Sequence, residues 1–142
     1  MNTYRHKLSF CAVHESADLG ALPESLGTAA QTIWRAGEPC TTRSGRNLGG
    51  VRKNSYCSID FGSGENLPRS LQEALAKLAP HRALLDGLSA SGAKFRFFVG
   101  WFSDGSCSRD VLDWELLRDI ADLKIALDLD LYGSGDEEPP EP

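Results

Sequence analysis

Residues 94–132 read KFRFFVGWFSDGSCSRDVLDWELLRDIADLKIALDLDLY, and this stretch decides the fold class. Apolar residues alternate with other residues in its first and last parts, and a period of two predicts β-strands with one buried face. Between these parts, apolar residues recur every three to four positions from Trp114 onward, which predicts an amphipathic helix. Asp113 stands where a helix N-cap is expected. The stretch therefore predicts a strand–helix–strand unit whose helix packs on its own sheet.

The last of these strands separates apolar and charged residues onto two faces. The odd positions from Ile125 to Leu131 are apolar and are expected to be buried, whereas Asp128 and Asp130 lie on the opposite face. Lys94 and Arg96 occupy the corresponding face of the first strand. If the two strands are neighbours, the opposite charges pair across the sheet for roughly 0.2–1 kcal/mol each. The alternative is a divalent cation between the aspartates, but we favour the ion pairs and predict no metal site.

Similar patterns occur in the rest of the chain. Strands are predicted at residues 4–11, 32–34 and 56–61, and helices at residues 18–27, 69–79 and 81–89. Pro80 separates the last two helices, because proline lacks an amide donor and clashes with the preceding turn. This order predicts an α+β fold: a mostly antiparallel or mixed sheet with helices packed on one face, built from repeated strand–helix–strand units, in the style of ferredoxin-like folds.

Length and composition indicate one globular domain. The chain has 142 residues, of which 41% are hydrophobic and 25% are charged, ordinary values for a soluble protein. We expect a single α+β domain over residues 1–132. Residues 133–142 contain four acids and no basic residue, which predicts a disordered acidic tail. Without these acids the formal net charge is −1 instead of −5, so the acidic balance says little about the domain surface.

The sequence also bears on the cellular compartment. No apolar stretch is long enough to cross a bilayer, and the apolar run at residues 8–13 is too short for the core of a signal peptide. Cys11, Cys40, Cys57 and Cys107 show no spacing typical of zinc ligands. We therefore expect a cytoplasmic protein with free thiols, and we expect Cys11 and Cys57 to be buried in strands.

Several short motifs occur along the chain in an order known from one family. They are Leu26-Gly27, Trp34-Arg35-Ala36-Gly37-Glu38, the leucine-rich helix ending at Leu78-Ala79-Pro80, and the closing run from Leu116 to Tyr132. On these motifs the chain resembles DUF4279, a bacterial domain family of unknown function, from about Tyr4 to Tyr132. Members of that family often have a tryptophan at the start of the third strand, where this chain has Tyr56. The resemblance implies no activity.

No catalytic constellation is recognisable in the sequence. GxSxG, Walker A, HExxH and GxGxxG patterns are absent, and the histidines at positions 6, 14 and 81 are dispersed. The glycine-rich segment at residues 44–50 lacks the Gly-Lys-Ser/Thr ending that binds phosphates. His6 lies on the apolar face of its strand and is expected to be a hydrogen-bonded core residue. We predict no catalytic residues and no cofactor. The sequence leaves open whether the chain is an enzyme, and we favour a non-catalytic role.

Residues 37–54 form the best candidate for a functional surface. This segment is rich in glycine, is long for a connection in a compact domain, and carries four basic residues against the single acid Glu38. Guanidinium groups can bind carboxylates or phosphates through two hydrogen bonds. The alternative is a mobile, solvated connection without function. The candidate binding residues in and beside this segment are Trp34, Arg35, Glu38, Arg43, Arg46 and Arg52.

Two functions are compatible with this segment. The first is a non-catalytic protein-interaction domain of the immunity, antitoxin or adaptor type, in which the basic loop and the adjacent sheet edge bind an acidic partner protein. The second is a small-molecule-binding protein or minor enzyme with an anionic ligand in a pocket between the sheet and the loop, near Arg35, Glu38 and Arg46. Nucleic acid is disfavoured, because the domain is nearly neutral and four basic residues give a weak electrostatic footprint. The oligomeric state is not predictable from these patterns.

Overall fold

The computed structural model describes residues 3–105 and 107–133. The strands of these residues are β1 (Tyr4–His14), β2 (Thr32–Trp34), β3 (Pro39–Thr41), β4 (Asn47–Val51), β5 (Ser55–Gly64), β6 (Lys94–Ser103) and β7 (Ile125–Tyr132). The helices are α1 (Ala21–Leu26), α2 (Leu67–Leu78), α3 (Arg82–Ala90) and α4 (Trp114–Asp122), with a 3₁₀ turn at Ala79–His81 between α2 and α3.

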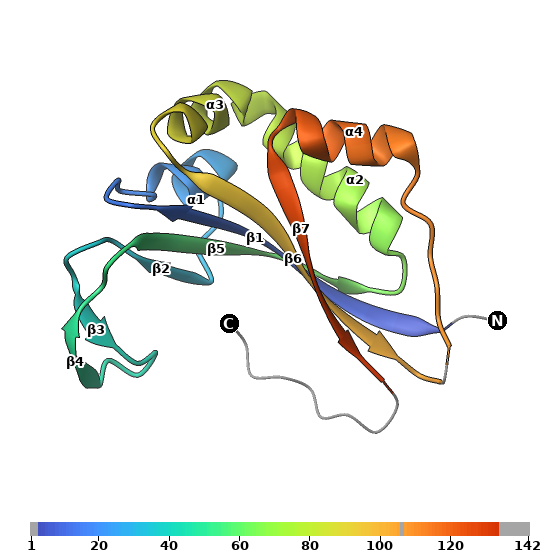
Figure 1. Ribbon diagram of the computed structural model, residues 1–142, viewed down its shortest axis with the longest axis horizontal. Coiled ribbons are helices and arrows are strands. Elements are labelled where there is room, and N and C mark those ends of the chain that lie inside the picture. The colour runs from blue at the N-terminus through green and yellow to red at the C-terminus, as the bar shows by residue number, and fades with distance from the viewer. Residues whose placement is uncertain (1–2, 106, 134–142) are drawn as a thin grey trace.

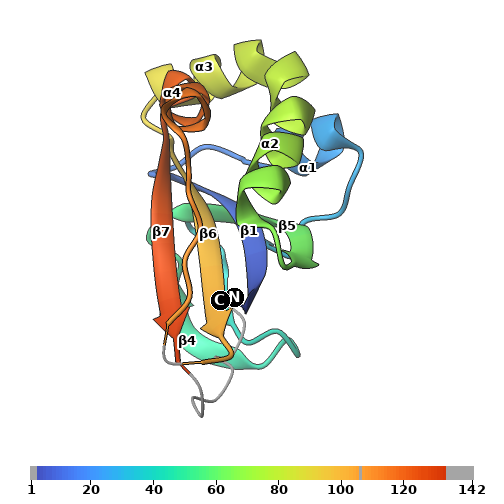
Figure 2. The same ribbon diagram turned by 90° about the vertical axis from the view of Figure 1, so that its right-hand side faces the viewer.

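The main sheet has the strand order β2-β5-β1-β6-β7, and β3 and β4 pair with each other in a second, two-stranded sheet. β1 is antiparallel to both β5 and β6, whereas β6 and β7 are parallel and are connected through α4. The helices lie on one face of the main sheet, and the β3–β4 hairpin projects below its other face (Figure 1, Figure 2). The predicted α+β class, with a mixed sheet and helices packed on one face, is confirmed.

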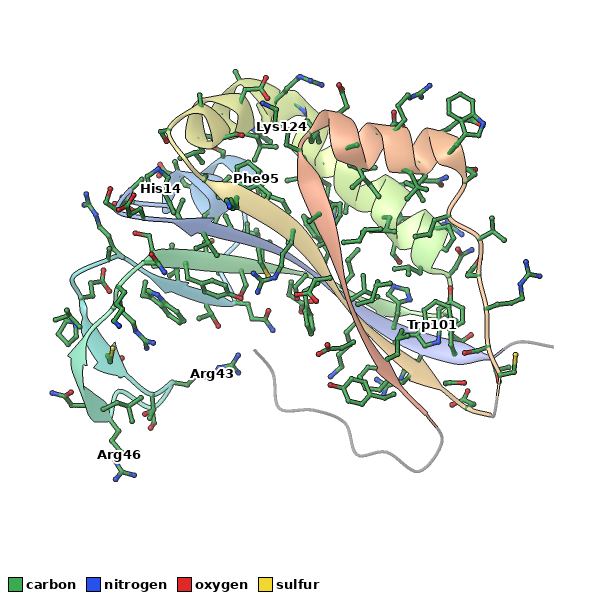
Figure 3. All side chains as sticks on the ribbon, viewed as in Figure 1. His14, Arg43, Arg46, Phe95, Trp101 and Lys124 are labelled. Carbon is green, nitrogen blue, oxygen red and sulfur yellow. The ribbon has the colours of Figure 1, made fainter. Side chains whose placement is uncertain are left out.

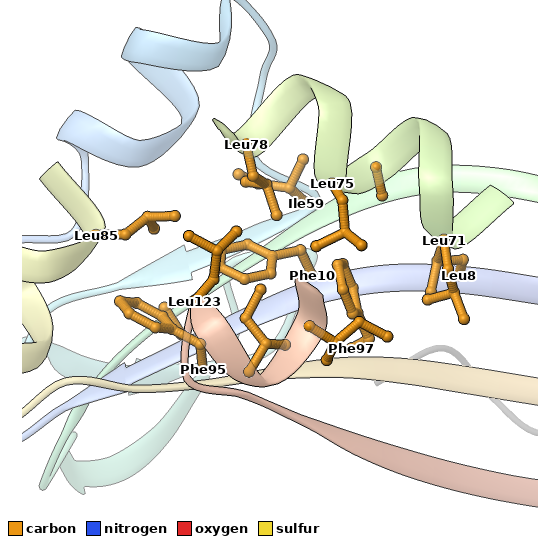
Figure 4. Packing of buried hydrophobic residues seen from close by; sticks show 14 of the residues in the cluster. Leu8, Phe10, Ile59, Leu71, Leu75, Leu78, Leu85, Phe95, Phe97 and Leu123 are labelled. Atoms are coloured by element: carbon orange, nitrogen blue, oxygen red, sulfur yellow. The ribbon is translucent and has the colours of Figure 1, made fainter. Parts of the chain in front are cut away.

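The core lies between the main sheet and the helices. β1 is central because it is hydrogen-bonded on both sides, and its alternate residues Leu8 and Phe10 are buried beneath the helices. Phe10 packs against Phe97 of β6, with ring centroids 5.8 Å apart in an edge-to-face arrangement. Leucines of α2 cover these rings (Figure 4). His6 is fully buried on the same face and its Nε2 lies 3.0 Å from Ser70 Oγ, as expected for a core histidine.

Local sequence signals determine where the helices begin and end. The Asp113 carboxylate accepts a hydrogen bond from Leu116 N at 2.9 Å and caps α4. The Asn66 side chain caps α2 in the same way. Gly27 ends α1 in the left-handed conformation, with φ 67°. Pro80 lies in the 3₁₀ turn that separates α2 from α3, so the predicted interruption is confirmed.

The segment predicted to be a loop contains β3 and β4. It forms an ordered hairpin in which Thr42 N donates to Arg46 O at 2.8 Å. β3 has three residues and begins with a proline, and β4 contains Gly49 and Gly50, both with positive φ. Short strands with glycine and proline show no two-residue period, so the sequence pattern could not reveal them.

The expectation that the whole apolar face of β7 is buried is wrong. Ile125 is buried and Leu127 is partly buried, but Leu129 is 49% exposed and Leu131 is 68% exposed. The reason is a difference in length. The nine residues of α4 span about 14 Å at the rise of a helix, whereas the eight residues of β7 span about 26 Å. The helix therefore covers only the first half of the strand.

The charged face of the β6–β7 pair agrees in part with the prediction. Arg96 Nε lies 3.2 Å from Asp128 Oδ2, so this ion pair across the two strands is present. Asp130, however, is aligned with Gly100, at the opposite end of β6 from Lys94, and it accepts a hydrogen bond from the Tyr132 hydroxyl at 3.3 Å. The parallel register therefore excludes the expected pairing of Lys94 with Asp130.

Two further expectations concern the membrane and the tail. Among the described residues, no helix has the length and apolar character needed to cross a membrane. The predicted acidic tail at residues 133–142 lies, apart from Gly133, outside the described residues.

Lys124 offers a test of the turn between α4 and β7. Its φ is 59°, a left-handed conformation that is unfavourable for a residue with a Cβ atom, and its N–H donates to Ala121 O at 2.8 Å (Figure 3). Replacing Lys124 by glycine removes this strain, so Lys124→Gly should raise the free energy of unfolding by about 0.5–1 kcal/mol in urea denaturation.

Lys77→Gly is the matched control, because Lys77 lies within α2 and is also exposed. Glycine lowers helix stability, so this variant should lose about 0.5–1 kcal/mol. Equal losses in the two variants would contradict the assignment of strain to Lys124.

Candidate functional site

The β3–β4 hairpin is attached to the main sheet by a defined hydrogen-bonded turn. Gly37 N donates to Arg52 O at 2.9 Å, and Arg52 N donates to Glu38 O at 2.8 Å. Ala36 N donates to the buried Ser55 Oγ at 3.0 Å. Gly37 has φ 89°, a conformation that glycine adopts without strain. These contacts hold the base of the hairpin at the end of β2 and the start of β5.

Arg52 and Trp34 are the centre of the candidate site. The Arg52 guanidinium carbon lies 3.9 Å from the centroid of the Trp34 ring, a cation–π contact. Arg52 Nη2 also donates to Thr41 O at 2.7 Å, which ties the guanidinium to β3. Trp34 is itself held by a hydrogen bond from its Nε1 to Asn54 O at 3.0 Å and by stacking on Tyr56, with centroids 4.9 Å apart. The guanidinium is thus positioned before any ligand arrives.

A cavity of about 480 Å³ lies between the hairpin and the helix-free face of the main sheet. We refer to it as the hairpin cavity. Its walls include the aromatic rings of Trp34 and Tyr56, the thiol of Cys40, and three cations. The cations are Arg52, Lys53 and Arg96. None of the residues that line this cavity is acidic, so it favours an anionic group.

One hydrogen-bond donor in the hairpin cavity has no acceptor within the described part of the chain. Arg52 Nε is buried and makes no hydrogen bond there. Arg96 Nε is also buried without a well-aligned acceptor, but it is close to the Asp128 carboxylate. A buried N–H without an acceptor costs about 1–3 kcal/mol. Because Nε is buried, a ligand oxygen in the cavity does not reach it, and an anion there would be attracted by the charge of the guanidinium as a whole.

A second, smaller cavity of about 310 Å³ shares Trp34 and Arg52 with the first. Its walls also include Glu38 and Arg43, so it contains charges of both signs. This mixture makes it less selective for anions than the hairpin cavity.

The remaining predicted site residues lie elsewhere. The Arg35 side chain turns toward the chain after β1, where its Nε donates to Ser16 O at 3.4 Å. Arg46 projects from the tip of the hairpin and lines neither cavity, and Arg43 leaves the hairpin in a different direction, beneath the main sheet (Figure 3). The structure therefore brings Trp34, Arg52, Glu38 and Arg43 around two adjoining cavities, and leaves Arg35 and Arg46 outside them.

The sequence reasoning missed three residues of the hairpin cavity: Cys40, Tyr56 and Arg96. Arg96 and Tyr56 lie on the helix-free face because they alternate with buried residues of β6 and β5, so the period of two contained that signal. What was missing was the order of the strands. Burial raises the pKa of Tyr56 to about 12, and its hydroxyl, 3.5 Å from Cys11 Sγ, is further held in the neutral form by that contact.

Large apolar residues near the two cavities remain exposed to solvent. Val51 of β4 lines the hairpin cavity, Ile33 of β2 lines the smaller one, and Leu48 of β4 is also exposed. Aromatic and arginine side chains are enriched at protein–protein interfaces, and this surface combines both.

Groups suited to metal binding do not converge in the described residues. No three side chains among their histidines, cysteines, aspartates and glutamates are placed to hold a metal ion. His14 Nε2 lies 3.0 Å from Ser91 Oγ and its Nδ1 accepts from Ser16 N, which gives this histidine a structural role. All four cysteines are free thiols, and Cys11 and Cys57 are buried as expected.

Comparison with models of known protein families shows which family the chain belongs to. The family model described as "Domain of unknown function (DUF4279)" matches residues 2–134. The chain belongs to the DUF4279 family. Neither a curated protein nor a solved structure shows significant similarity to it. In this DUF4279 chain, the residues Trp34 to Glu38 form the turn that attaches the hairpin, so that stretch of the sequence positions the candidate site.

Tyrosines and cysteines of raised pKa give this DUF4279 protein a defined response to alkali. Burial raises the pKa of Tyr4 and of Tyr56 to about 12, and the pKa of Cys57 to about 11. Each value is above that of the unfolded chain, so the folded state holds these protons more tightly. The stability from these groups is complete below about pH 9 and is lost as the pH rises toward 12. Urea denaturation under reducing conditions should therefore give a falling free energy of unfolding from pH 9 to pH 11.5.

Tyr56→Phe separates the contribution of the candidate site, because phenylalanine keeps the ring beside Trp34 and removes the ionisable hydroxyl. The decrease in stability between pH 9 and pH 11.5 should be smaller in this variant than in the wild type. An identical decrease in both proteins would contradict the burial argument for Tyr56.

Proposed function

We propose that residues 1–132 form a non-catalytic protein-interaction domain of the bacterial immunity, antitoxin or adaptor type, and that the hairpin face binds an acidic segment of a partner protein. The observation that supports this most directly is the Arg52 guanidinium, which is held against Trp34 in a cavity whose walls include no acidic residue. A carboxylate is the natural acceptor for such a donor. Lys53, in the same cavity, adds favourable charge, whereas the charge of Arg96 is shared with Asp128.

The composition of the surface favours a protein over a free small molecule. Tryptophan, tyrosine and arginine are the residue types that dominate binding energy at protein interfaces, and Trp34, Tyr56 and Arg52 meet in the hairpin cavity. The exposed Leu48 and Val51 extend this surface along the hairpin. Val51 lines the cavity, but Leu48 does not, so a ligand inside the cavity would leave Leu48 in water, whereas a protein interface of about 800 Å² per partner could cover it.

The proposed setting is a reducing compartment, the cytoplasm. Its support is the free state of all four cysteines, since disulfides form and persist mainly outside the cytosol.

A second candidate function is a small anionic-ligand-binding protein or minor enzyme with its site in the hairpin cavity. The observation that favours it is the cavity volume of about 480 Å³, which lies within the range of ligand pockets, about 300–1,000 Å³. A thermal-shift screen with nucleotides, phosphosugars and dicarboxylates tests this candidate, because a ligand selective for the folded state must raise the melting temperature. If none of these anions raises it, this candidate is rejected.

Arg52→Ala tests the interaction function. Affinity capture from a bacterial lysate with the wild-type chain should recover an acidic partner, and Arg52→Ala should reduce its recovery about tenfold, a loss of about 1.4 kcal/mol. Increasing salt should reduce recovery as well, because exposed charge pairs are screened. Recovery is measured by quantitative mass spectrometry.

Arg118→Ala is the matched control. Arg118 also stacks on a tryptophan, Trp114, at 5.3 Å, but on the exposed surface of α4 away from the hairpin. Its variant should recover the partner as the wild type does. Equal recovery with Arg52→Ala and Arg118→Ala, in proteins with unchanged melting temperatures, would refute the role of the hairpin.

Thiol labelling gives an independent readout of where a captured partner sits. Cys40 lines the hairpin cavity, whereas the exposed Cys107 lies in the connection between β6 and α4. Iodoacetamide labelling of Cys40 should slow when the partner binds. Slower labelling of Cys107 alone would place the partner away from the hairpin and contradict the proposal.

A further inference from the structure

β7 is an edge strand whose outer side has no pairing strand among the described residues. It is the last strand in the order of the main sheet, and β6 occupies its inner side. An edge strand presents N–H and C=O groups that can pair with another chain, and proteins usually blunt such edges with charges, prolines or bulges. Between Ile125 and Tyr132 there is no proline, and the register with β6 runs without a shift. The charges of β7, Asp128 and Asp130, are both negative, so its outer edge is suited to pairing with a segment of opposite charge.

A groove runs beside the second half of β7. A cavity of about 530 Å³ lies between β7, the end of β6 and the connection that follows β6. We refer to it as the β7 groove. Its apolar walls come from Leu67, Trp101, Leu112, Leu129 and Leu131. The last two leucines are the exposed residues that α4 does not cover. The groove thus offers apolar contact directly beside the open edge.

The wall of the groove is held rigidly. The Tyr4 hydroxyl donates a short hydrogen bond to Asp110 and accepts one from Leu67 N at 2.8 Å, which joins the connection after β6 to the start of α2. The Trp101 ring stacks on Tyr4, with centroids 3.7 Å apart, and its Nε1 donates to Ser108 Oγ at 2.8 Å. A site held in this way loses little conformational entropy when it binds a ligand.

The two faces of β7 have different chemistry. Leu129 and Leu131 face the groove, whereas Asp128 and Asp130 lie on the helix-free face. Asp128 forms an ion pair with Arg96, and 46% of its side chain remains exposed to solvent. A strand that pairs with this edge would place alternate side chains beside leucines and beside aspartates.

We propose that the outer edge of β7 binds an extended segment of a partner protein by strand addition. The segment alternates apolar residues, which enter the β7 groove, with basic residues, which face Asp128 and Asp130. Main-chain hydrogen bonds supply affinity and the alternation supplies specificity. This site is separate from the hairpin cavity and takes a partner segment of opposite charge, so it stands or falls independently of the proposed function.

A second copy of this chain fits the edge less well. If two β7 strands paired antiparallel about Leu129, Asp128 of each would lie opposite Asp130 of the other. Like charges directly opposite one another destabilise a sheet. The charges of β7 thus favour a basic segment over self-association.

The test uses two capped nine-residue peptides, one alternating lysine with valine and one alternating glutamate with valine. The lysine peptide should bind at least tenfold more tightly by fluorescence anisotropy. It should also slow hydrogen exchange of the backbone amides at residues 127–131 and alkylation of Cys107, which lines the β7 groove, while Cys40 keeps its rate. The control for non-specific charge attraction is a peptide of the same composition in which all lysines precede all valines. It should bind at least tenfold more weakly than the alternating lysine peptide.

Leu131→Asp should weaken binding of the alternating lysine peptide about tenfold, and Leu117→Asp, on the exposed face of α4, should leave it unchanged. Asp130→Lys should reverse the preference between the lysine and glutamate peptides. Equal binding of the two alternating peptides, or binding without protection of residues 127–131, would overturn the proposal. Light scattering would also overturn the proposal if the mass doubled with protein concentration and Leu131→Asp abolished this doubling. That result would show that the edge of β7 binds a second copy of this chain.

Discussion

The structure depends on β1, which is hydrogen-bonded to β5 on one side and to β6 on the other. Its alternation sends Leu8 and Phe10 into the core and Ser9 and Cys11 to the helix-free face. Aligned residues of paired strands point to the same face of the sheet, so β5 and β6 show the same division into a buried face and a helix-free face. Through β6 it continues to β7, where leucines and aspartates separate onto opposite faces. The helix-covered face and the helix-free face of the main sheet both follow from this alternation.

The helix layer is smaller than the sheet that it covers. A strand advances about twice as far per residue as a helix, so α4 buries Ile125 but not Leu131. The result is an apolar groove at one end of the sheet. At the other end the hairpin forms a cationic cavity on the opposite face. The protein therefore presents two candidate binding surfaces of different character, at opposite ends and on opposite faces of the main sheet.

The candidate site could be predicted only in part. Trp34 and Arg52 were recognisable as residue types suited to binding, but eighteen positions separate them in the sequence. Their stacking requires the turn in which Gly37 and Glu38 bond to Arg52. Arg35 and Arg46 have the same side chain as Arg52 and lie in or beside the same segment, yet they point away from both cavities. Charge and composition cannot separate these three arginines, because the direction of each side chain depends on backbone conformation.

The sequence by itself determined the elements with strong periodicity and clear ends. Asp113, Gly27 and Pro80 act on their nearest neighbours, so their effects on helix boundaries are readable without the fold. The tertiary structure decided the strand order, the β3–β4 hairpin and the exposure of Leu129 and Leu131. Periodicity states which side chains share a face, whereas coverage of that face depends on the length and position of another element. Both candidate surfaces arise from that second kind of information.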